Sequence, residues 1–175
     1  MSANEELQEH AHHAQDPFDK RVAVTMATIA AVLATVSVGA HIFANEELLA
    51  QQQSSDQFAF YQAKASRRYA SEVARDMLRA LQSETAVKLS ETYENNAKRY
   101  AKEAEEIQPE AEKLKAESIL KGKQSLRMEG GEVFLELGIV LASLAILSKR
   151  KPVWFASILS GAVGIGIALT AALVR

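Results

Sequence analysis

Three histidines and a glutamate near the start of the chain could hold a metal ion. Glu9 and His13 are four residues apart, and His10 and His13 are three apart, with His12 between them. A helix would therefore present imidazole and carboxylate ligands to one ion. The alternative is a solvated tail, and the segment is short and polar with nothing to hold it. We therefore predict that the protein has no metal site. If one existed, His10 and His13 would be its candidate ligands.

A second pair of ionisable residues lies inside apolar segments. His41 is near the end of the first such segment, and Glu136 is inside the second. If these segments cross the membrane boundary near residues 44 and 132, both groups lie about 4–6 Å inside the same side. An ionisable group there is costly unless it is paired or reached by water. We predict a contact between His41 and Glu136, within one chain or across an interface; the alternative is that each reaches the headgroups separately or that Glu136 is uncharged.

No other residues have the spacing of a catalytic site. The chain has no cysteine, which excludes thiolate nucleophiles, disulfides and thiolate metal sites. Serine and threonine occur without a histidine and acid partner, and Gly161, Gly164 and Gly166 lie in an apolar segment rather than in a phosphate-binding loop. The formal net charge of -2 provides no general attraction to nucleic acid. We predict a protein that is not an enzyme and binds no cofactor.

The first apolar segment is predicted to be a transmembrane helix over residues 17–44. It is uncharged from Val22 to Ala44, about the length that a helix needs to cross ~30 Å of hydrocarbon. Residues 1–16 form a polar, acidic tail, which favours a retained span over a cleaved signal peptide. Asp16 is the predicted N-cap, and Pro17 is the predicted first helical residue.

Two further spans are predicted near the end of the sequence. Residues 152–175 are uncharged up to the last residue, with Trp154 and Phe155 placed as interfacial anchors. Residues 131–148 are shorter and include two glutamates, so a buried core helix is the alternative. A basic turn at 149–151 leads straight into the last segment, which favours a membrane hairpin.

Small residues recur at four-residue spacing in the first and third spans. Membrane helices pack by close contact, which favours this spacing, although alanine-rich helices also produce it by chance. Gly164 and Ala168 are the contact residues that we predict for the third span. The two stripes are Ala23, Ala27, Ala31, Thr35 and Gly39, and Ala156, Ser160, Gly164, Ala168 and Ala172.

The segment between the first two spans, residues 45–130, has the composition of long helices. Phe58, Tyr69 and Ala80 are eleven residues apart, a period that predicts little supercoiling. The large residues of this part could dock a partner helix, but we favour the core of the segment itself. They form one stripe of Phe58, Tyr61, Ala65, Tyr69, Val73, Met77 and Ala80 or Leu81.

The second part of this segment contains a heptad pattern. Tyr93, Tyr100, Ile107 and Leu114 recur every seven residues, which predicts a packing seam and an interaction surface. Lysine and glutamate fill the other positions and most simply form a solvated face. A small residue precedes each large one by three positions, and the row reads Ser90, Ala97, Ala104, Ala111 and Ser118.

The chain must turn between these two parts, because spans one and two enter the middle segment from the same side. Asn95-Asn96 is the strongest local turn signal, and Ser83-Glu84-Thr85 is the alternative, where a helix would start. Pro109 removes one intrahelical hydrogen bond and predicts a kink near residue 105 or 106. The expected fold is all-α, with three transmembrane helices and an extramembrane antiparallel helical hairpin that resembles a coiled coil.

Several blocks of the sequence resemble an uncharacterised bacterial family, the domain of unknown function 4337. They are Tyr61-Gln62-Ala63-Lys64-Ala65-Ser66, the apolar run from Leu137 to Ala145, and the basic turn before Trp154. The acidic tail, first span and helical middle also fit, so the resemblance covers nearly the whole chain. It implies a small bacterial membrane protein and supplies no catalytic residue or substrate. Pro109 departs from the continuous charged helix expected of the family.

The basic residues near the membrane predict the orientation. Lys20, Arg21 and the turn at 149–151 lie on one side, which favours a cytoplasmic N-terminus and a periplasmic hairpin in the bacterial inner membrane. Lys121, Lys123 and Arg127 near the second span weaken this argument.

The function that these features favour is structural. We expect a scaffold that self-associates, or an accessory subunit of a larger membrane complex, with lipid and other membrane subunits as partners and no nucleic acid. The alternative is a small oligomeric channel or transporter with Glu136 near its pore mouth, although few residues of the spans could line a water path.

Overall fold

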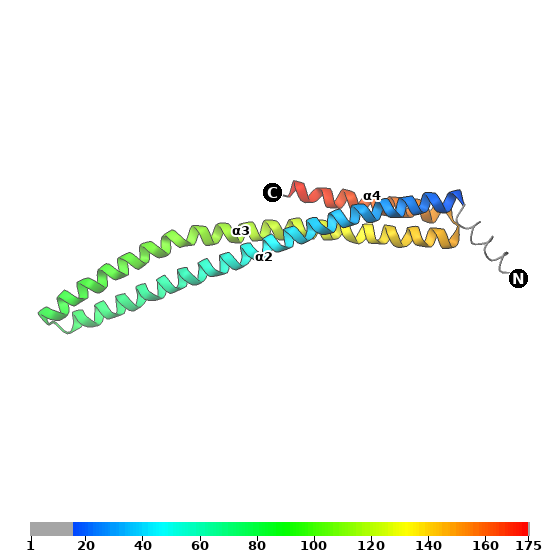
Figure 1. Cartoon of the computed structure of the whole chain (residues 1–175). Helices are drawn as coiled ribbons and strands as arrows, with labels where there is room; N and C mark the ends of the chain where they lie inside the picture. The colour runs from blue at the N-terminus through cyan, green and yellow to red at the C-terminus, as the bar shows by residue number, and fades with distance from the viewer. Residues whose placement is uncertain (1–15, 175) are drawn as a thin grey trace. The chain divides into compact units, whose positions relative to one another are not determined.

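The structure is a computed structural model that describes residues 16–174, and this part of the chain is all helical with no strand. Helix α2 comprises Pro17–Ala80, α3 comprises Glu84–Ser148 and α4 comprises Lys151–Leu169 (Figure 1). A short 3-10 helix, η1, covers Thr170–Leu173. Each of the three α-helices contains a segment that is long and apolar enough to cross a membrane.

The chain divides into two compact units. Of the described residues, 16–45 and 120–174 form the span unit, and Glu46–Ile119 form the hairpin unit. Helices α2 and α3 each contribute to both units without a break. Along α3, the hairpin unit ends at Ile119 and the span unit resumes at Leu120, whereas the predicted second span begins at residue 131. The boundaries of the membrane spans stay predictions.

Helix α2 begins where the sequence predicts. Pro17 is its first residue, and the Phe18 backbone N–H donates to Asp16 Oδ1 at 2.9 Å. The Asp16 side chain thereby satisfies one of the backbone donors that the first turn of a helix leaves unpaired. Proline is tolerated at this position because its missing N–H would have no partner there.

In the span unit, α3 packs against both other helices. Ser125 Oγ donates to the Ala40 carbonyl of α2 at 3.4 Å, and Ser160 Oγ of α4 donates to the Phe134 carbonyl at 2.7 Å. Leu135 is fully buried, and its side chain lies against Gly164 of α4. Helix α4 also contacts α2, because Trp154 Nε1 donates to Thr25 Oγ1 at 3.1 Å.

Glycines set the distance between α3 and α4. A Cβ placed on Gly131 would lie 2.6 Å from the Gly164 carbonyl oxygen, and a Cβ on Gly164 would lie 2.7 Å from that of Gly131. Neither residue could carry a side chain without separating the helices. Small residues allow this close approach where water provides no driving force.

The turn between α3 and α4 is closed by ion pairs. Lys149 has a positive φ of 52°, and its ammonium group binds Asp19 and also Asp16, the latter at 3.0 Å. The hydrogen bond to Asp19, followed by that to Asp16, raises the pKa of Lys149. The basic turn predicted at 149–151 is thus partly neutralised by the start of α2.

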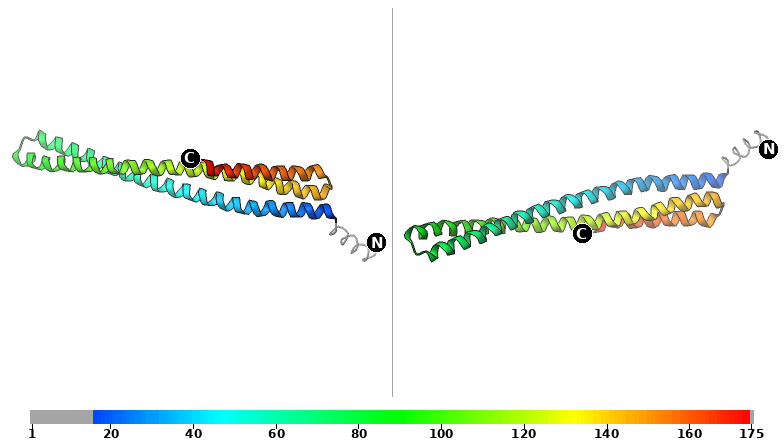
Figure 2. Two further views of the ribbon diagram at one scale, coloured as in Figure 1. Left: turned by 90° about the horizontal axis from the view of Figure 1, so that it is seen from above. Right: turned by 90° about the horizontal axis from the view of Figure 1, so that it is seen from below.

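In the hairpin unit, α2 and α3 run antiparallel on either side of a tight turn, as both views of Figure 2 show. The turn lies at residues 81–83, where Gln82 has a positive φ of 52°, and α3 starts at Glu84. The prediction of a turn at Asn95-Asn96 was wrong, because both residues lie inside α3. The alternative helix start at Ser83-Glu84-Thr85 was the correct signal.

Pro109 does not end α3. The residue is exposed and lies inside the helix, which continues on both sides of it. Its missing N–H costs one intrahelical hydrogen bond, and the predicted kink stays a prediction.

Two glycines of α4 provide a matched test of this packing. Gly164→Ala should lower the thermal stability of the protein in mild detergent by about 1–3 kcal/mol, because the new Cβ overlaps α3. Gly166→Ala should raise it by up to about 1 kcal/mol, since no atom lies within 4 Å and alanine favours helix. Equal shifts in the two variants would contradict the α3–α4 contact.

Candidate interaction surfaces

The heptad seam predicted in α3 faces α2 of the same chain. The small positions are buried, with Ala111 at 0% exposure, whereas Tyr93, Tyr100, Ile107 and Leu114 are only half-buried. The small residues therefore determine how closely the two helices approach, and the large ones lie at the edges of the contact. We call this row the inner seam of α3; it comprises Ser90, Ala97, Ala104, Ala111 and Ser118.

Tyr100 shows what its edge position does. Its ring has three cations around it: Lys64 Nζ at 5.7 Å and Arg67 at 6.0 Å from α2, and Arg99 at 4.8 Å from α3. A cation within about 6 Å of a tyrosine ring is attracted to its face. Tyr100 thus contacts side chains of both helices of the hairpin.

The face of α2 that meets this seam is polar. Ser54 Oγ donates to the Ala111 carbonyl at 3.0 Å, and Ser71 is also buried. Two ion pairs join the helices, Lys64 with Glu103 at 2.5 Å and Arg79 with Glu94. Hydroxyl groups and charges therefore join the two helices in addition to the large side chains that are half-buried at the edges of the contact.

These ion pairs favour the ionised form of the Glu94 and Glu103 carboxyl groups over the protonated form. The hydrogen bond from Lys64 lowers the pKa of Glu103. A hydrogen bond from Lys98, with a further contribution from Arg79, lowers the pKa of Glu94. Both pairs are partly exposed, so solvent reduces what they contribute to stability.

The opposite face of α2 carries no charge between Ala59 and Ala80, and Asp56 is the charged residue next to it. Along it, uncharged residues alternate at four- and three-residue spacing, and all of them are exposed. This spacing is the heptad pattern of a helix that packs against another helix. We call it the outer seam of α2; it comprises Ala59, Ala63, Ser66, Ala70, Val73, Met77 and Ala80.

The large-residue stripe predicted as the core of the hairpin is only partly buried. Phe58, Tyr61 and Ala65 are half-buried, as expected of a core. Val73 and Met77 are 52% and 67% exposed, and Tyr69, Ala80 and Leu81 are also exposed. The eleven-residue period was therefore misleading, because the contact between the helices follows the heptads of α3.

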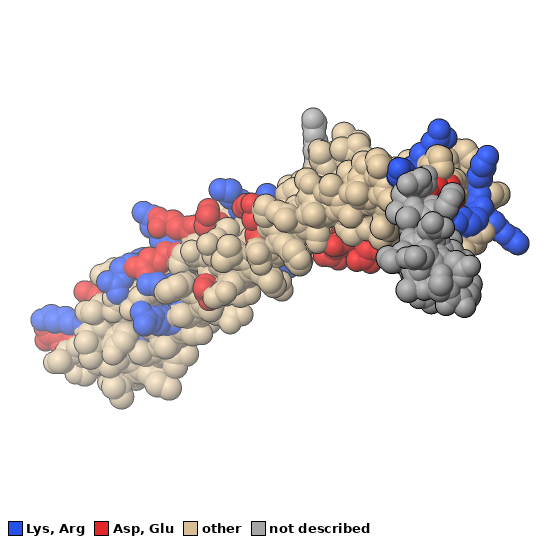
Figure 3. All heavy atoms as spheres, turned by 45° about the vertical axis from the view of Figure 1, so that its right-hand side comes forward, with Lys and Arg blue, Asp and Glu red and all other residues tan. Residues whose placement is uncertain are grey.

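The corresponding outer face of α3 is charged. Lys88, Lys102 and Glu106 lie on it and are exposed, with Lys88 bound to Glu84 at 3.1 Å. Figure 3 shows charged side chains along one edge of the hairpin unit and a broad uncharged surface beside them. Of these two outer faces, that of α2 exposes uncharged residues and that of α3 exposes charged ones, so the face of α2 is the one whose burial would be favourable.

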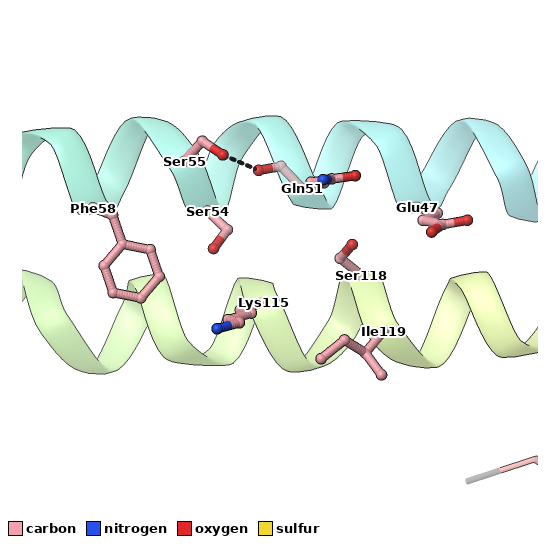
Figure 4. A pocket seen from close by; sticks show the side chains of 8 residues that line it. All are labelled: Glu47, Gln51, Ser54, Ser55, Phe58, Lys115, Ser118 and Ile119. Atoms are coloured by element: carbon pink, nitrogen blue, oxygen red, sulfur yellow. Dashed lines mark hydrogen bonds between the residues drawn. The ribbon is translucent and has the colours of Figure 1, made fainter.

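A hollow of about 370 Å³ lies between the two helices of the hairpin unit (Figure 4). Ser54 and Ser118 are small at its centre, and the larger Phe58 and Ile119 also line it. The hydroxyl of Ser55 donates to the Gln51 carbonyl at 2.9 Å, so that donor is already used. The remaining lining residues are Glu47, Gln51 and Lys115.

The small residues predicted for contacts in the third span are used within the chain. Gly164 and Ala168 are buried, and both lie against Gly131 of α3. The stripe of the first span differs, because Ala23, Ala27, Ala31 and Thr35 are exposed and Gly39 is half-buried.

The structure does not bring His41 and Glu136 together within one chain. Both are exposed, and neither has a hydrogen bond or ion pair with any described residue. The Ser125–Ala40 hydrogen bond sets His41 level with residue 124 of α3, so Glu136 lies roughly 18 Å further along the axis. A contact between His41 of one chain and Glu136 of another stays a prediction.

The same register places two glutamates opposite uncharged stretches of both neighbouring helices. Glu132 is level with residues 33–35 of α2 and 162–163 of α4, close to the middle of each apolar stretch. Glu136 is one turn further along. Glu132 is half-buried and, like Glu136, has no hydrogen bond or ion pair among residues 16–174.

The metal candidates His10 and His13 lie outside the described residues. Within residues 16–174, no group of three or more histidine, aspartate or glutamate side chains could hold a metal ion.

Comparison with known proteins places the chain in a family. The family described as "Domain of unknown function (DUF4337)" matches residues 18–174. The chain belongs to this family. The family resemblance seen in the sequence is thereby confirmed. No curated protein and no solved structure matches the chain.

The outer seam of this DUF4337 member is the surface that sequence reasoning missed. Its signal was present, because uncharged residues at alternating four- and three-residue spacing run from Ala59 to Ala80. Val73 and Met77 belong both to this row and to the large-residue stripe that was predicted as the core, so they were assigned to the core.

The ion pairs of the hairpin predict a pH dependence. Because the pKa of both Glu94 and Glu103 is lowered from 4.5 on folding, their contribution to stability is present above that pH. It is lost as the pH falls through the folded-state value. The thermal midpoint of the full chain should therefore fall between pH 7 and about pH 3.

Glu103→Gln should reduce this fall, because the variant has lost one of the titrating pairs. Glu117→Gln, a change at an exposed carboxylate of the same helix, serves as the control and should behave like the parent chain. An unchanged fall in the Glu103 variant would contradict the role of the Lys64–Glu103 pair.

Proposed function

We propose that this protein is a structural membrane protein without catalytic activity. Its three spans anchor a helical hairpin outside the membrane, and the uncharged face of α2 in that hairpin docks other protein. The protein acts as a scaffold that associates with itself, or as an accessory subunit of a larger membrane complex. The bacterial inner membrane, with the N-terminus in the cytoplasm and the hairpin in the periplasm, is the location that we propose.

The observation that carries this proposal is the outer seam of α2. A solvated helix normally exposes charge, yet here seven exposed heptad positions are uncharged and include Val73 and Met77. Two charged residues of the same helix, Lys64 and Arg79, pair with α3 instead. A second helical partner is what would remove this apolar surface from water.

The anchoring part rests on length and composition. Each α-helix has a segment apolar enough to span a membrane, and α2 and α3 also form the hairpin unit. Any span formed by these helices is thus continuous with the docking face. The proposed orientation is supported by basic residues at the span ends that lie away from the hairpin, namely Lys20, Arg21 and Arg150.

A charge placed in the seam tests this function. Ala70→Glu should reduce the native mass of the full chain in mild detergent to that of the monomer, because it buries a carboxylate in the docking face. Ala116→Glu is the matched control, since this alanine is exposed on the charged face of α3. Both variants should keep the helical circular-dichroism signal of the parent chain. An oligomer that survives Ala70→Glu as well as Ala116→Glu would contradict the proposal.

A channel is the second candidate, and one observation favours it. Glu132 and Glu136 have no partner among the described residues, at a depth where both neighbouring helices are uncharged. An ionisable residue within a span is commonly found facing a water-filled path or another subunit. Several copies arranged around these residues would form such a path. The candidate pore residue in such an assembly is Glu136, near the pore mouth.

Cation flux into vesicles distinguishes the two candidates. For a channel, the purified chain should conduct, and Glu136→Gln should lower the flux by about tenfold or more because it removes the charge that attracts the cation. A scaffold should produce no flux above that of empty vesicles, whatever residue stands at position 136.

A further inference from the structure

We propose that the partner of the outer seam is a second copy of this chain, whose α2 packs against it in antiparallel orientation. This inference rests on the proposed docking function and specifies its occupant. It is carried by the arrangement of small and large residues along the seam, by a hollow on the same face and by the residues that flank it.

The outer seam is unequal at its two ends. The end nearer the first span has Ala59, Ala63 and Ser66, whereas the end nearer the turn has Val73 and Met77. Ala70 lies close to the midpoint. Closely packed helices need large side chains opposite small ones, because two large residues push the helices apart and two small ones leave a void.

An antiparallel two-fold axis close to Ala70 satisfies this requirement for both large residues of the seam. It places Met77 of each copy opposite Ala63 of the other, and Val73 opposite Ser66. The remaining layers, Ala59 with Ala80 and Ala70 with itself, pair small residues, so large residues beside the seam must cover them. Such an interface is isologous, so each complementary contact occurs twice. A parallel pairing instead sets Met77 against Met77 and Ala63 against Ala63.

A hollow lies where this register needs one. Its volume is about 300 Å³, and Asp56, Ala59, Phe60 and Ala63 line it on α2. Met77 and Leu81 of the second copy would reach it. Both of these side chains are more than 60% exposed in the single chain, Met77 at 67% and Leu81 at 68%. The hollow and the side chains that would fill it thus belong to the same surface.

The residues beside the seam agree with the same axis. On one side, the exposed Phe60 of each copy meets the exposed Leu81 of the other. On the other side, Tyr69 lies next to the axis and faces its own copy, with its ring already against Arg68 at 4.6 Å. Large apolar flanks therefore cover the small centre of the seam.

Single cysteines test the inference, because the natural chain has none. Ala70→Cys should form a disulfide dimer of the full chain in mild detergent and reports contact through the seam in either orientation. Ala63→Cys mixed with Met77→Cys should cross-link at least about tenfold more than either variant alone, since like positions lie roughly 20 Å apart across the axis. Tags of different length on the two variants identify the mixed dimer. Ala116→Cys provides the background from collision.

The outcomes separate the two proposals. A cross-link at Ala70 together with the mixed Ala63–Met77 dimer supports the antiparallel pair. Cross-links of Ala63→Cys with itself and of Met77→Cys with itself would mean a parallel pair, which overturns the inference and leaves the docking function intact. No cross-link above the Ala116→Cys background at any position would overturn self-association, and a different protein or a lipid surface would then cover the seam.

Discussion

The close approach of α2 and α3 in the hairpin is the constraint on which the rest of that unit depends. Serine or alanine occupies every seventh position of α3 from Ser90 to Ser118, so the helix contributes little apolar area to the contact. Hydroxyl groups and ion pairs such as Lys64–Glu103 also join the helices. Ser54 and Ser71 of α2 are buried at this contact, whereas Val73 and Met77 of the outer seam are exposed. The small residues of α3 thus meet a partly polar face of α2 and leave the outer seam uncovered.

The span unit uses the same device for a different physical reason. In the hairpin, small residues let polar groups reach across a narrow gap. Between α3 and α4, Gly131 and Gly164 let the backbones touch, which gives dispersion contacts where lipid removes the hydrophobic drive. Serine hydroxyls add hydrogen bonds to the facing carbonyls, as Ser160 does. One class of small residue therefore organises both units.

This close packing also determines where ionisable groups lie. The register between α2 and α3 follows from contacts such as Ser125 with Ala40, and it carries Glu132 to the middle of the uncharged stretches. The same register separates His41 from Glu136. The pairing does not form within one chain, because the boundary of each span was estimated alone, whereas the relative depth of two helices depends on how their side chains interlock.

The sequence by itself determined the helical class, the start of α2 at Pro17 and the family. These depend on composition, on a local cap and on motifs within single segments, all of which are written along the chain. Only the tertiary structure decided that the turn lies at residues 81–83 and that Met77 faces outward. A period along one helix reveals that a stripe exists, but not which of two stripes a distant helix covers. That choice depends on contacts between residues far apart in the chain, and here the small residues of α3 made it.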